Sequence, residues 1–506
     1  MAFMATTISV ALQTNLSLTI VYMVQTNHDE THVSVTNECN VIRNNSFNTS
    51  RHSESSSGKL NWSTETQDYI IGLQYLGMIL GYIPGGYLGE LYGAKNTMNI
   101  TILIASAFTI ISSFAANISV YIFIICRIIV GLGTAPVFPL LVIMISKWIP
   151  KSERSFISSI MLAGFGTGAS ISNLTAGALC SSNFFGGWPS VFYLNGIVGI
   201  IWCICSYFLV HESPDAHPTI SLKELDYLRR SIGPPKKEMK SVPWKSVATS
   251  VPVWALAIGT FGQFWLLAFF VTCHTLYLGT VLNLGSLEAC SNESGSAKAA
   301  VRSKTSTVKG VNGILSCAPN LFRAVFACIV GFAIDWMRRR KEFSIVVKLN
   351  CISVDTAAAC LGFVGVMYAG CDPVLATRAF ILSSLCGDFC TFGVSLAPTD
   401  IAPNISGTLS GILCSIGSIP YFMLPAIVGL FTKNEQSLRQ WENIFYCTIG
   451  VTIVTTLVYV FFGTSDPQPW AIDDNNSIGD LKHNEEQKCN EPLSETYHHT
   501  FVNTRK

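Results

Sequence analysis

Long apolar runs, separated by short polar segments, dominate the chain between residues 3 and 463. A helix that crosses a bilayer needs about 20 consecutive, mostly apolar residues, so this pattern predicts about twelve membrane-spanning helices. Only helices and closed barrels can satisfy backbone hydrogen bonds in lipid, and the runs are of helical length, which indicates an all-α membrane protein. The predicted spans are residues 3–24, 67–88, 97–115, 120–145, 156–179, 189–210, 251–282, 311–334, 346–368, 376–397, 406–431 and 442–463.

The first predicted span begins almost at Met1, where a secretory signal sequence would also lie. A signal sequence carries basic residues before its apolar core. Here no Lys or Arg precedes Arg43, and Gln13 and Asn15 interrupt the apolar run. We therefore expect a true span whose polar residues face a cavity, and we leave open whether a cytoplasmic leader precedes it.

Composition strengthens the membrane assignment. Of the 506 residues, 49% are hydrophobic and only 12% are charged, and the mean hydropathy is +0.42. Soluble domains are usually about 25% charged. The net charge of +1 gives no reason to expect a nucleic-acid partner. No HExxH, GxSxG or P-loop pattern occurs, so we do not expect an enzyme.

The distribution of basic residues predicts the orientation. Lys and Arg gather at residues 95, 147–154, 223–245 and 338–348, whereas the turns near 116–119 and 180–188 have none. Cytoplasmic loops are enriched in Lys and Arg, so we expect both termini to be cytoplasmic. The polar loop 283–310 then lies outside, although it carries basic residues of its own.

The predicted outer loops carry candidate modification sites. Asn-X-Ser/Thr sequons in the loops 25–66 and 283–310 predict glycosylation. The asparagines are Asn44, Asn48, Asn61 and Asn292. Most of the 17 cysteines lie within apolar spans, where a thiol behaves as a small hydrophobic group. Four cysteines could face outside, and whether any two of them pair is left open: Cys39, Cys180, Cys290 and Cys371.

The chain divides into two similar halves. After the second and the eighth span, a glycine precedes a carboxylate by four residues and basic residues follow. These residues are Gly86, Glu90 and Lys95 in one half, and Gly331, Asp335 and Arg338 in the other. We expect the charged ones, with Glu153 and Arg154, to form a cytoplasmic gate between two six-helix bundles. Repeated halves are typical of transporters whose substrate site lies between them.

The predicted domains follow from this repeat. Residues 1–210 form the N-terminal bundle with the glycosylated loop 25–66, 211–250 a cytoplasmic linker, 251–463 the C-terminal bundle with the loop 283–310, and 464–506 a disordered cytoplasmic tail.

Arg127 is the main candidate for substrate binding. It lies near the outer end of the fourth span, and an arginine costs about 3 kcal/mol or more at the bilayer centre. Such a group persists when something pairs with it. An anionic substrate is one candidate, since a guanidinium can bind two oxygens of one anion at once. A neighbouring carboxylate or carbonyl is the structural alternative.

Other polar residues within the spans are candidates for lining a cavity or for coupling. Asp388 and His274 could titrate and carry protons, although each could equally be a hydrogen-bonded structural residue. The cavity candidates are Gln13, Asn15, Tyr75, Gln263 and Trp265. Each of them could instead be a contact between helices.

Several motifs resemble the major facilitator superfamily, and within it the anion-transporter branch of sialin, the vesicular glutamate transporters and the type I sodium–phosphate cotransporters. The motifs lie at residues 15–17, 61–63, 81–88, 127–133, 147–155, 188–193, 217–218, 400–403 and 468–470. They occur in order along nearly the whole chain. The most specific is Lys147-Trp148-Ile149-Pro150 followed by Glu153-Arg154-Ser155.

The resemblance implies the major facilitator fold of twelve helices and alternating access. It also implies transport of organic or inorganic anions, driven by H⁺, Na⁺ or the membrane potential without another cofactor. The fourth-span arginine of the family, which attracts the substrate's negative group, falls on Arg127. A first-span arginine found in some members of the family falls on Gln13. The acidic or amide residue that follows the family's fourth-span arginine falls on Thr134. These departures make a dicarboxylate less expected than a monoanion such as sialic acid or phosphate.

A receptor that kept the fold and lost transport is the competing hypothesis, since such losses would suit it. We expect a monomer in the lipid bilayer with a small anion as its partner. The plasma membrane is the default location, and a lysosomal or vesicle membrane is the alternative.

Overall fold

The computed structural model describes residues 1–24, 60, 62, 64–150, 153–181, 184–232, 242–273, 277, 325–336, 345–386, 394, 397–432, 438–464 and 466–471. Within these ranges the chain is helical, and extended pairing is limited to a single parallel bridge between Val24 and Leu60. The predicted all-α class is confirmed.

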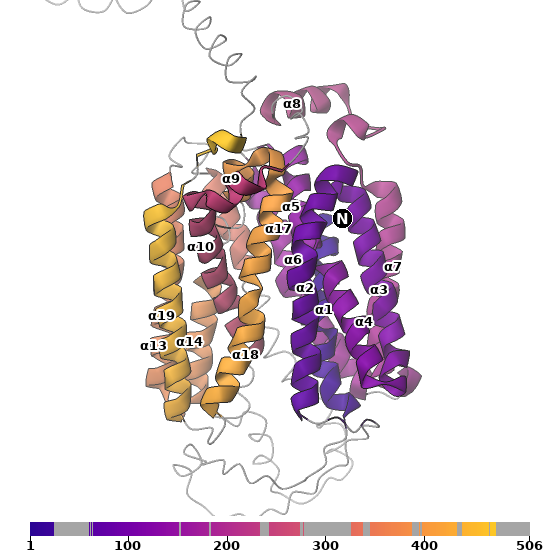
Figure 1. Cartoon of the computed structure of the whole chain (residues 1–506), viewed down its shortest axis with the longest axis vertical. Helices are drawn as coiled ribbons and strands as arrows, with labels where there is room; N and C mark the ends of the chain where they lie inside the picture. Colours follow the sequence, from indigo (N-terminus) through magenta and orange to yellow (C-terminus); the bar gives the residue numbers. More distant parts are fainter. Residues whose placement is uncertain are drawn as a thin grey trace, which may run out of the picture.

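The N-terminal helices stand side by side (Figure 1). They are α1 (Ala2–Met23), α2 (Thr64–Tyr92), α3 (Ala94–Ile118), α4 (Val120–Thr134), α5 (Val137–Trp148), α6 (Arg154–Ser181) and α7 (Pro189–Leu209). Two short helices follow at one end of the molecule: α8 (Leu222–Ile232) lies by the N-terminal helices and α9 (Trp244–Thr249) by the second group (Figure 1).

The remaining helices form a second group. They are α10 (Val251–Ala268), a helix Val325–Trp336, α13 (Ile345–Ala369), α14 (Pro373–Cys386), α16 (Ala397–Ile401), α17 (Ser406–Gly417), α18 (Ile419–Thr432) and α19 (Leu438–Phe462). In Figure 1, α17 and α18 are the members of this group that face α2. The domain boundaries expected from the sequence stay predictions.

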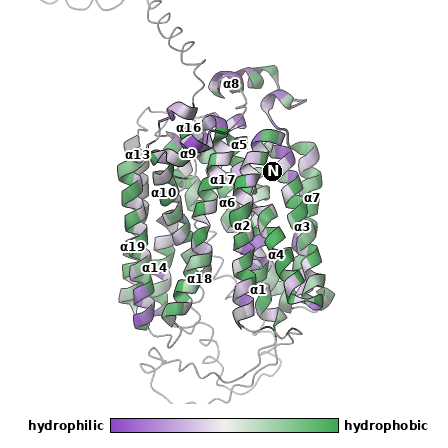
Figure 2. Ribbon diagram, in the orientation of Figure 1, coloured by the Kyte–Doolittle hydropathy of each residue, from purple (hydrophilic) through white to green (hydrophobic). Residues whose placement is uncertain are grey.

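Each predicted span overlaps a helix of the described chain. Seven of those helices are long and apolar enough to cross a membrane. Two of these seven combine consecutive helices, because α4 with α5 and α17 with α18 each run on as 29 residues. Figure 2 shows hydrophobic residues along the helices and hydrophilic residues gathered around α8, α9 and α16. That end is the one predicted to be cytoplasmic.

Small residues allow α2 and α4 to approach closely. A Cβ atom added at Gly131 would lie 2.2 Å from the Gln74 carbonyl oxygen, and one added at Gly77 would lie 2.3 Å from that of Ile128. Real Cβ contacts are never this short, so only glycine permits the observed spacing. Close backbone approach through small residues is the usual way in which membrane helices pack.

The Gly131→Ala substitution is expected to lower stability, because the new methyl group meets backbone that cannot rotate away. Overpacking of this kind costs about 1–3 kcal/mol, so the thermal unfolding midpoint in detergent should fall. Gly450→Ala is the matched control, since nothing lies within 4 Å of the Cβ position there. A Gly131→Ala midpoint equal to that of the control would contradict the close packing.

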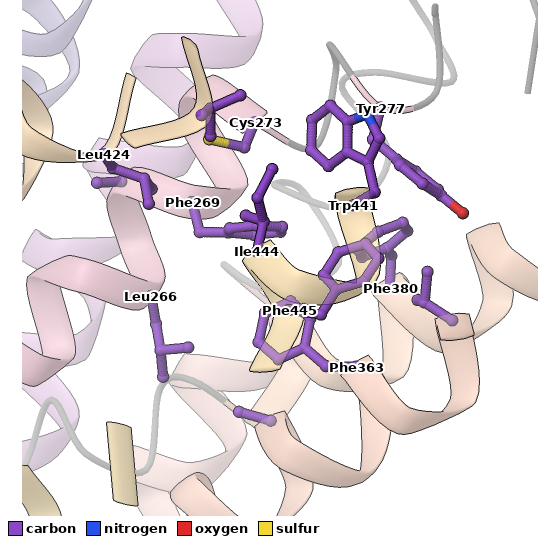
Figure 3. Close-up of a cluster of buried hydrophobic side chains, with 14 of the residues drawn as sticks. Leu266, Phe269, Cys273, Tyr277, Phe363, Phe380, Leu424, Trp441, Ile444 and Phe445 are labelled. Carbon is purple, nitrogen blue, oxygen red and sulfur yellow. The ribbon is translucent and has the colours of Figure 1, made fainter. Parts of the chain in front are cut away.

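Aromatic side chains fill the core of the second group (Figure 3). The ring of Phe269 lies 4.9 Å from that of Phe363 and 5.8 Å from that of Phe445, measured between centroids. Phe269 begins a π-helical turn, Phe269–Cys273, which continues α10. Packing around this turn joins α10 to α13 and α19.

Candidate functional site

Arg127 lies on α4 and is fully buried. Its Nη1 donates a hydrogen bond of 3.2 Å to Oδ1 of Asn15 on α1. The guanidinium carbon also lies over two aromatic rings, 5.2 Å from the centroid of Phe123 and 4.7 Å from that of Phe192. Cation–π attraction is stronger when the cation is desolvated. The structure therefore holds this charge between α1, α4 and α7.

Helical spacing and packing explain why these residues meet. Phe123 precedes Arg127 by four residues, so both lie on one face of α4. On the same face Thr134 follows two turns later, and its carbonyl oxygen accepts a hydrogen bond from the Ser9 hydroxyl on α1. α1 and α4 thus run antiparallel, with Asn15 opposite Arg127.

Arg127 keeps unused donors. Its Nε and Nη2, together with Nδ2 of Asn15, are buried without a hydrogen-bond partner in the described part of the chain. No carboxylate of that part lies within ion-pair distance of it. A buried charge without a counter-ion is strongly unfavourable. Of the carboxylate or carbonyl named as the structural alternative to a substrate anion, the described residues supply the side-chain carbonyl of Asn15 and no carboxylate.

The structure spreads the other substrate-binding candidates over both halves. Gln13 is half-buried, and its carbonyl oxygen accepts a hydrogen bond of 2.9 Å from Nε2 of Gln74 on α2. The hydroxyl of Thr134 donates within its own helix, to the carbonyl oxygen of Val130 at 2.9 Å. The roles of Gln13 and Thr134 towards a substrate stay predictions.

Tyr75 joins the two halves. Its ring stacks on that of Tyr421 of α18, with centroids 4.9 Å apart and planes 13° apart. Beside this pair, Tyr82 and Met78 of α2 pack against Cys414 of α17. The halves therefore meet through aromatic and apolar side chains midway along α2.

Gln263 and Trp265 belong to α10. Gln263 is half-buried next to Gly262, which packs against Thr455 of α19. Trp265 is buried, and its indole nitrogen lies 3.5 Å from the hydroxyl of Thr448, to which it donates. Trp265 thus lies inside the second half, and a substrate contact for either residue stays a prediction.

Glu90 binds one half to the other at the end predicted to be cytoplasmic. Its Oε1 accepts hydrogen bonds from the backbone N–H groups of Gly407 at 2.8 Å and Thr408 at 3.0 Å, and its Oε2 accepts one from the Thr408 hydroxyl. These residues begin α17. A carboxylate at a helix N-terminus satisfies unpaired donors and complements the positive end of the helix dipole.

Asp335 makes the reciprocal connection. Its two carboxylate oxygens accept hydrogen bonds from the backbone N–H groups of Ser155 at 3.1 Å and Phe156 at 2.8 Å, at the start of α6. Nearby, Arg154 donates to the Thr399 hydroxyl at 3.1 Å and lies 3.9 Å from Asp400. Each repeated carboxylate therefore caps a helix of the opposite half.

Lys95 and Glu153 lie at the same end. The ammonium group of Lys95 is 5.4 Å from the centroid of the Tyr207 ring. The carboxylate of Glu212 accepts hydrogen bonds from the backbone N–H groups at the start of α3 and binds Lys147. Glu153 belongs to the turn before α6, where its N–H donates to Pro150.

Some residues that form these contacts could hardly be recognised from the sequence. The i, i+4 spacing could have revealed Phe123, whereas Phe192 and Tyr421 belong to distant helices and resemble ordinary core residues. Glu212 lies 65 residues from Lys147, and nothing in the local sequence links the two.

Several candidates lie outside the described residues. They are Asp388, His274, Arg338 and the glycosylation sites Asn44, Asn48, Asn61 and Asn292. Of the four cysteines considered for pairing, Cys371 is disulfide-bonded and Cys180 carries a free thiol.

Comparison with known proteins identifies the family to which this architecture belongs. The family model of the Major Facilitator Superfamily matches residues 2–425. The chain is 29% identical to human (Homo sapiens) sialin over 477 residues, which cover 94% of this chain and 90% of sialin. It is also 29% identical to the vesicular glutamate transporter 3 of Danio rerio over 427 residues, covering 83% of this chain and 67% of the relative.

The fold is similar to that of the proton:xylose symporter XylE bound to 6-bromo-6-deoxy-D-glucose. The TM-score is 0.61 at 14% identity, and the match covers 92% of this chain and 95% of the symporter. Relatives and fold together show a transporter that crosses the membrane many times. The chain belongs to the Major Facilitator Superfamily.

Proposed function

We propose that this transporter carries small, singly charged organic or inorganic anions across its membrane by alternating access. The observation that carries the proposal is the buried guanidinium of Arg127, whose Nε and Nη2 are unpartnered among the described residues. An anion that binds there would supply the missing counter-charge and acceptors in a site away from water. The named relatives sialin and the vesicular glutamate transporter support an anionic substrate.

The charge count favours a monoanion. Around Arg127 the described side chains are aromatic or uncharged, and Gln13 and Thr134 add no second cation. A dianion would bring an uncompensated negative charge into these surroundings, which is costly. We therefore favour an acidic sugar such as sialic acid, another monocarboxylate or monobasic phosphate over a dicarboxylate.

Alternating access explains the two caps. In this conformation Glu90 and Asp335 hold the cytoplasmic ends of the halves together. For substrate to pass to the cytoplasm, both capped helix ends must release their carboxylates. The caps are few and polar, so water can replace them when the halves part.

We propose H⁺ or Na⁺ as the coupling ion. Moving one net charge is worth about 2.3 kcal/mol per 100 mV, so a monoanion that travels with one proton is insensitive to the membrane potential. Asp388 and His274 remain the candidate proton carriers. The membrane of residence is proposed to be the plasma membrane, or alternatively that of lysosomes or vesicles.

Uptake into vesicles that hold the purified protein tests the proposal. Labelled sialic acid, glutamate and inorganic phosphate are each offered with an imposed pH gradient, and again with sodium on one side only. We expect saturable accumulation of a monoanion above its equilibrium level, and no accumulation in protein-free vesicles. If none of the anions accumulates under either gradient, the proposal is wrong.

A further inference from the structure

We propose that Asn15 is a positioning residue that presents one edge of Arg127 to the substrate's anionic group. This inference rests on the proposed anion transport. Asn15 is fully buried on α1, and its side-chain oxygen holds Nη1 of Arg127 from 112 residues away in the sequence. The contact fixes the rotation of the guanidinium, which otherwise could turn about its long side chain.

The atoms that stay unpartnered identify the binding edge. They are Nε and Nη2 of Arg127, which share one edge of the planar guanidinium. Their N–H bonds point the same way, and this fork matches two oxygens of one carboxylate or phosphate group. Because Asn15 occupies Nη1, the Nε–Nη2 edge is the remaining place for a bidentate contact.

The two aromatic rings do not compete for that edge. Phe123 and Phe192 attract the cation but offer no oxygen to its N–H groups. Beyond them the cluster is apolar and includes Leu16 and Ile20 of α1. The described surroundings therefore stabilise the charge while leaving two of its strongest donors unused.

An amide suits position 15 better than a carboxylate would. The oxygen of Asn15 accepts a hydrogen bond without cancelling the positive charge of Arg127, so the charge stays available to the substrate.

Asn15→Asp tests whether the charge of Arg127 must stay unpaired within the protein for the anion to bind. A carboxylate of the same shape would pair with Arg127 and take the place of the substrate, so we expect the KM for anion uptake to rise about 100-fold. If the substrate did not use the charge of Arg127 that Asn15 leaves free, the new ion pair would leave the KM unchanged. Labelled sialic acid and inorganic phosphate, tested separately, show whether a carboxylate or a phosphate uses the edge.

Asn15→Leu and a matched control complete the experiment. Asn15→Leu removes one hydrogen bond to a charged group, and we expect the KM to rise about 10-fold, the factor typical of such a bond. The maximal rate per protein molecule should change little. Asn195→Leu is the control, since Asn195 is a buried amide on α7 that donates to Val191, and its KM should match that of the unmodified protein.

The outcomes are distinct. Raised KM values in both Asn15 variants, with a normal control, support the inference. Anion uptake by the unmodified protein with an unchanged KM in Asn15→Asp overturns the role of Asn15 and leaves anion transport standing. Failure of the unmodified protein to accumulate any anion overturns both proposals.

Discussion

Arg127→Lys is expected to abolish anion uptake while the protein still reaches the membrane. Lysine keeps the positive charge but lacks the planar fork, so it cannot hold two oxygens of one anion in parallel. The variant loses two charged hydrogen bonds, each worth about 1.5–3 kcal/mol. Uptake at low substrate should therefore fall about 100-fold or more, measured in vesicles as the initial rate per protein molecule.

Arg229→Lys is the matched control for that variant. Arg229 lies on α8 and pairs with Asp215 where both side chains are exposed, and exposed ion pairs contribute little. Its uptake should equal that of the unmodified protein. Normal uptake by Arg127→Lys, with equal amounts of both variants in the vesicles, would refute a substrate role for the guanidinium.

Glu90→Ala is expected to open the cytoplasmic side. The substitution removes the carboxylate that accepts hydrogen bonds from Gly407 and Thr408 at the start of α17. A hydrogen bond to a charged group contributes about 1.5–3 kcal/mol, and 1.4 kcal/mol corresponds to a factor of about ten. The open population should therefore rise about 10-fold or more.

Cys414 reports this opening. It is buried against Met78 and Tyr82 of the opposite half, so a thiol reagent reaches it when the halves separate. We expect alkylation of Cys414 from the cytoplasmic side to be about 10-fold faster in Glu90→Ala, in proportion to the open population. Cys414→Ser identifies the labelled peptide, and Glu224→Ala on exposed α8 is the charge control. An unchanged alkylation rate in Glu90→Ala would show that the cap does not hold the gate.

The helices could be predicted from the sequence because each depends on its own residues. A run of about 20 apolar residues suffices to cross a bilayer wherever it stands in the chain. The same local logic marked Arg127, a charge inside such a run, and the repeated carboxylates Glu90 and Asp335. None of these predictions required knowledge of which helices are neighbours.

The partners of these charged groups could not be predicted, since they come from distant segments. Glu90 meets Thr408 across 318 residues, and Asp335 meets Ser155 across 180. Both carboxylates bind backbone N–H groups, which every residue except proline carries. No pattern of side chains in the sequence therefore predicts these partners. The sequence suggested a charged gate at this end, and the structure shows that both carboxylates cap helices of the opposite half.

Thus the sequence by itself determined the membrane class, the spans, the expected orientation and the residues whose charge required a partner. Those properties follow from hydropathy and charge along short stretches. The tertiary structure alone decided that Arg127 meets Asn15 and two phenylalanine rings, and that two of its nitrogens stay unpartnered within the described chain. The physical reason is that each helix crosses the bilayer because of its own hydrophobic residues. The partners of a buried charge, in contrast, depend on which helices pack around it.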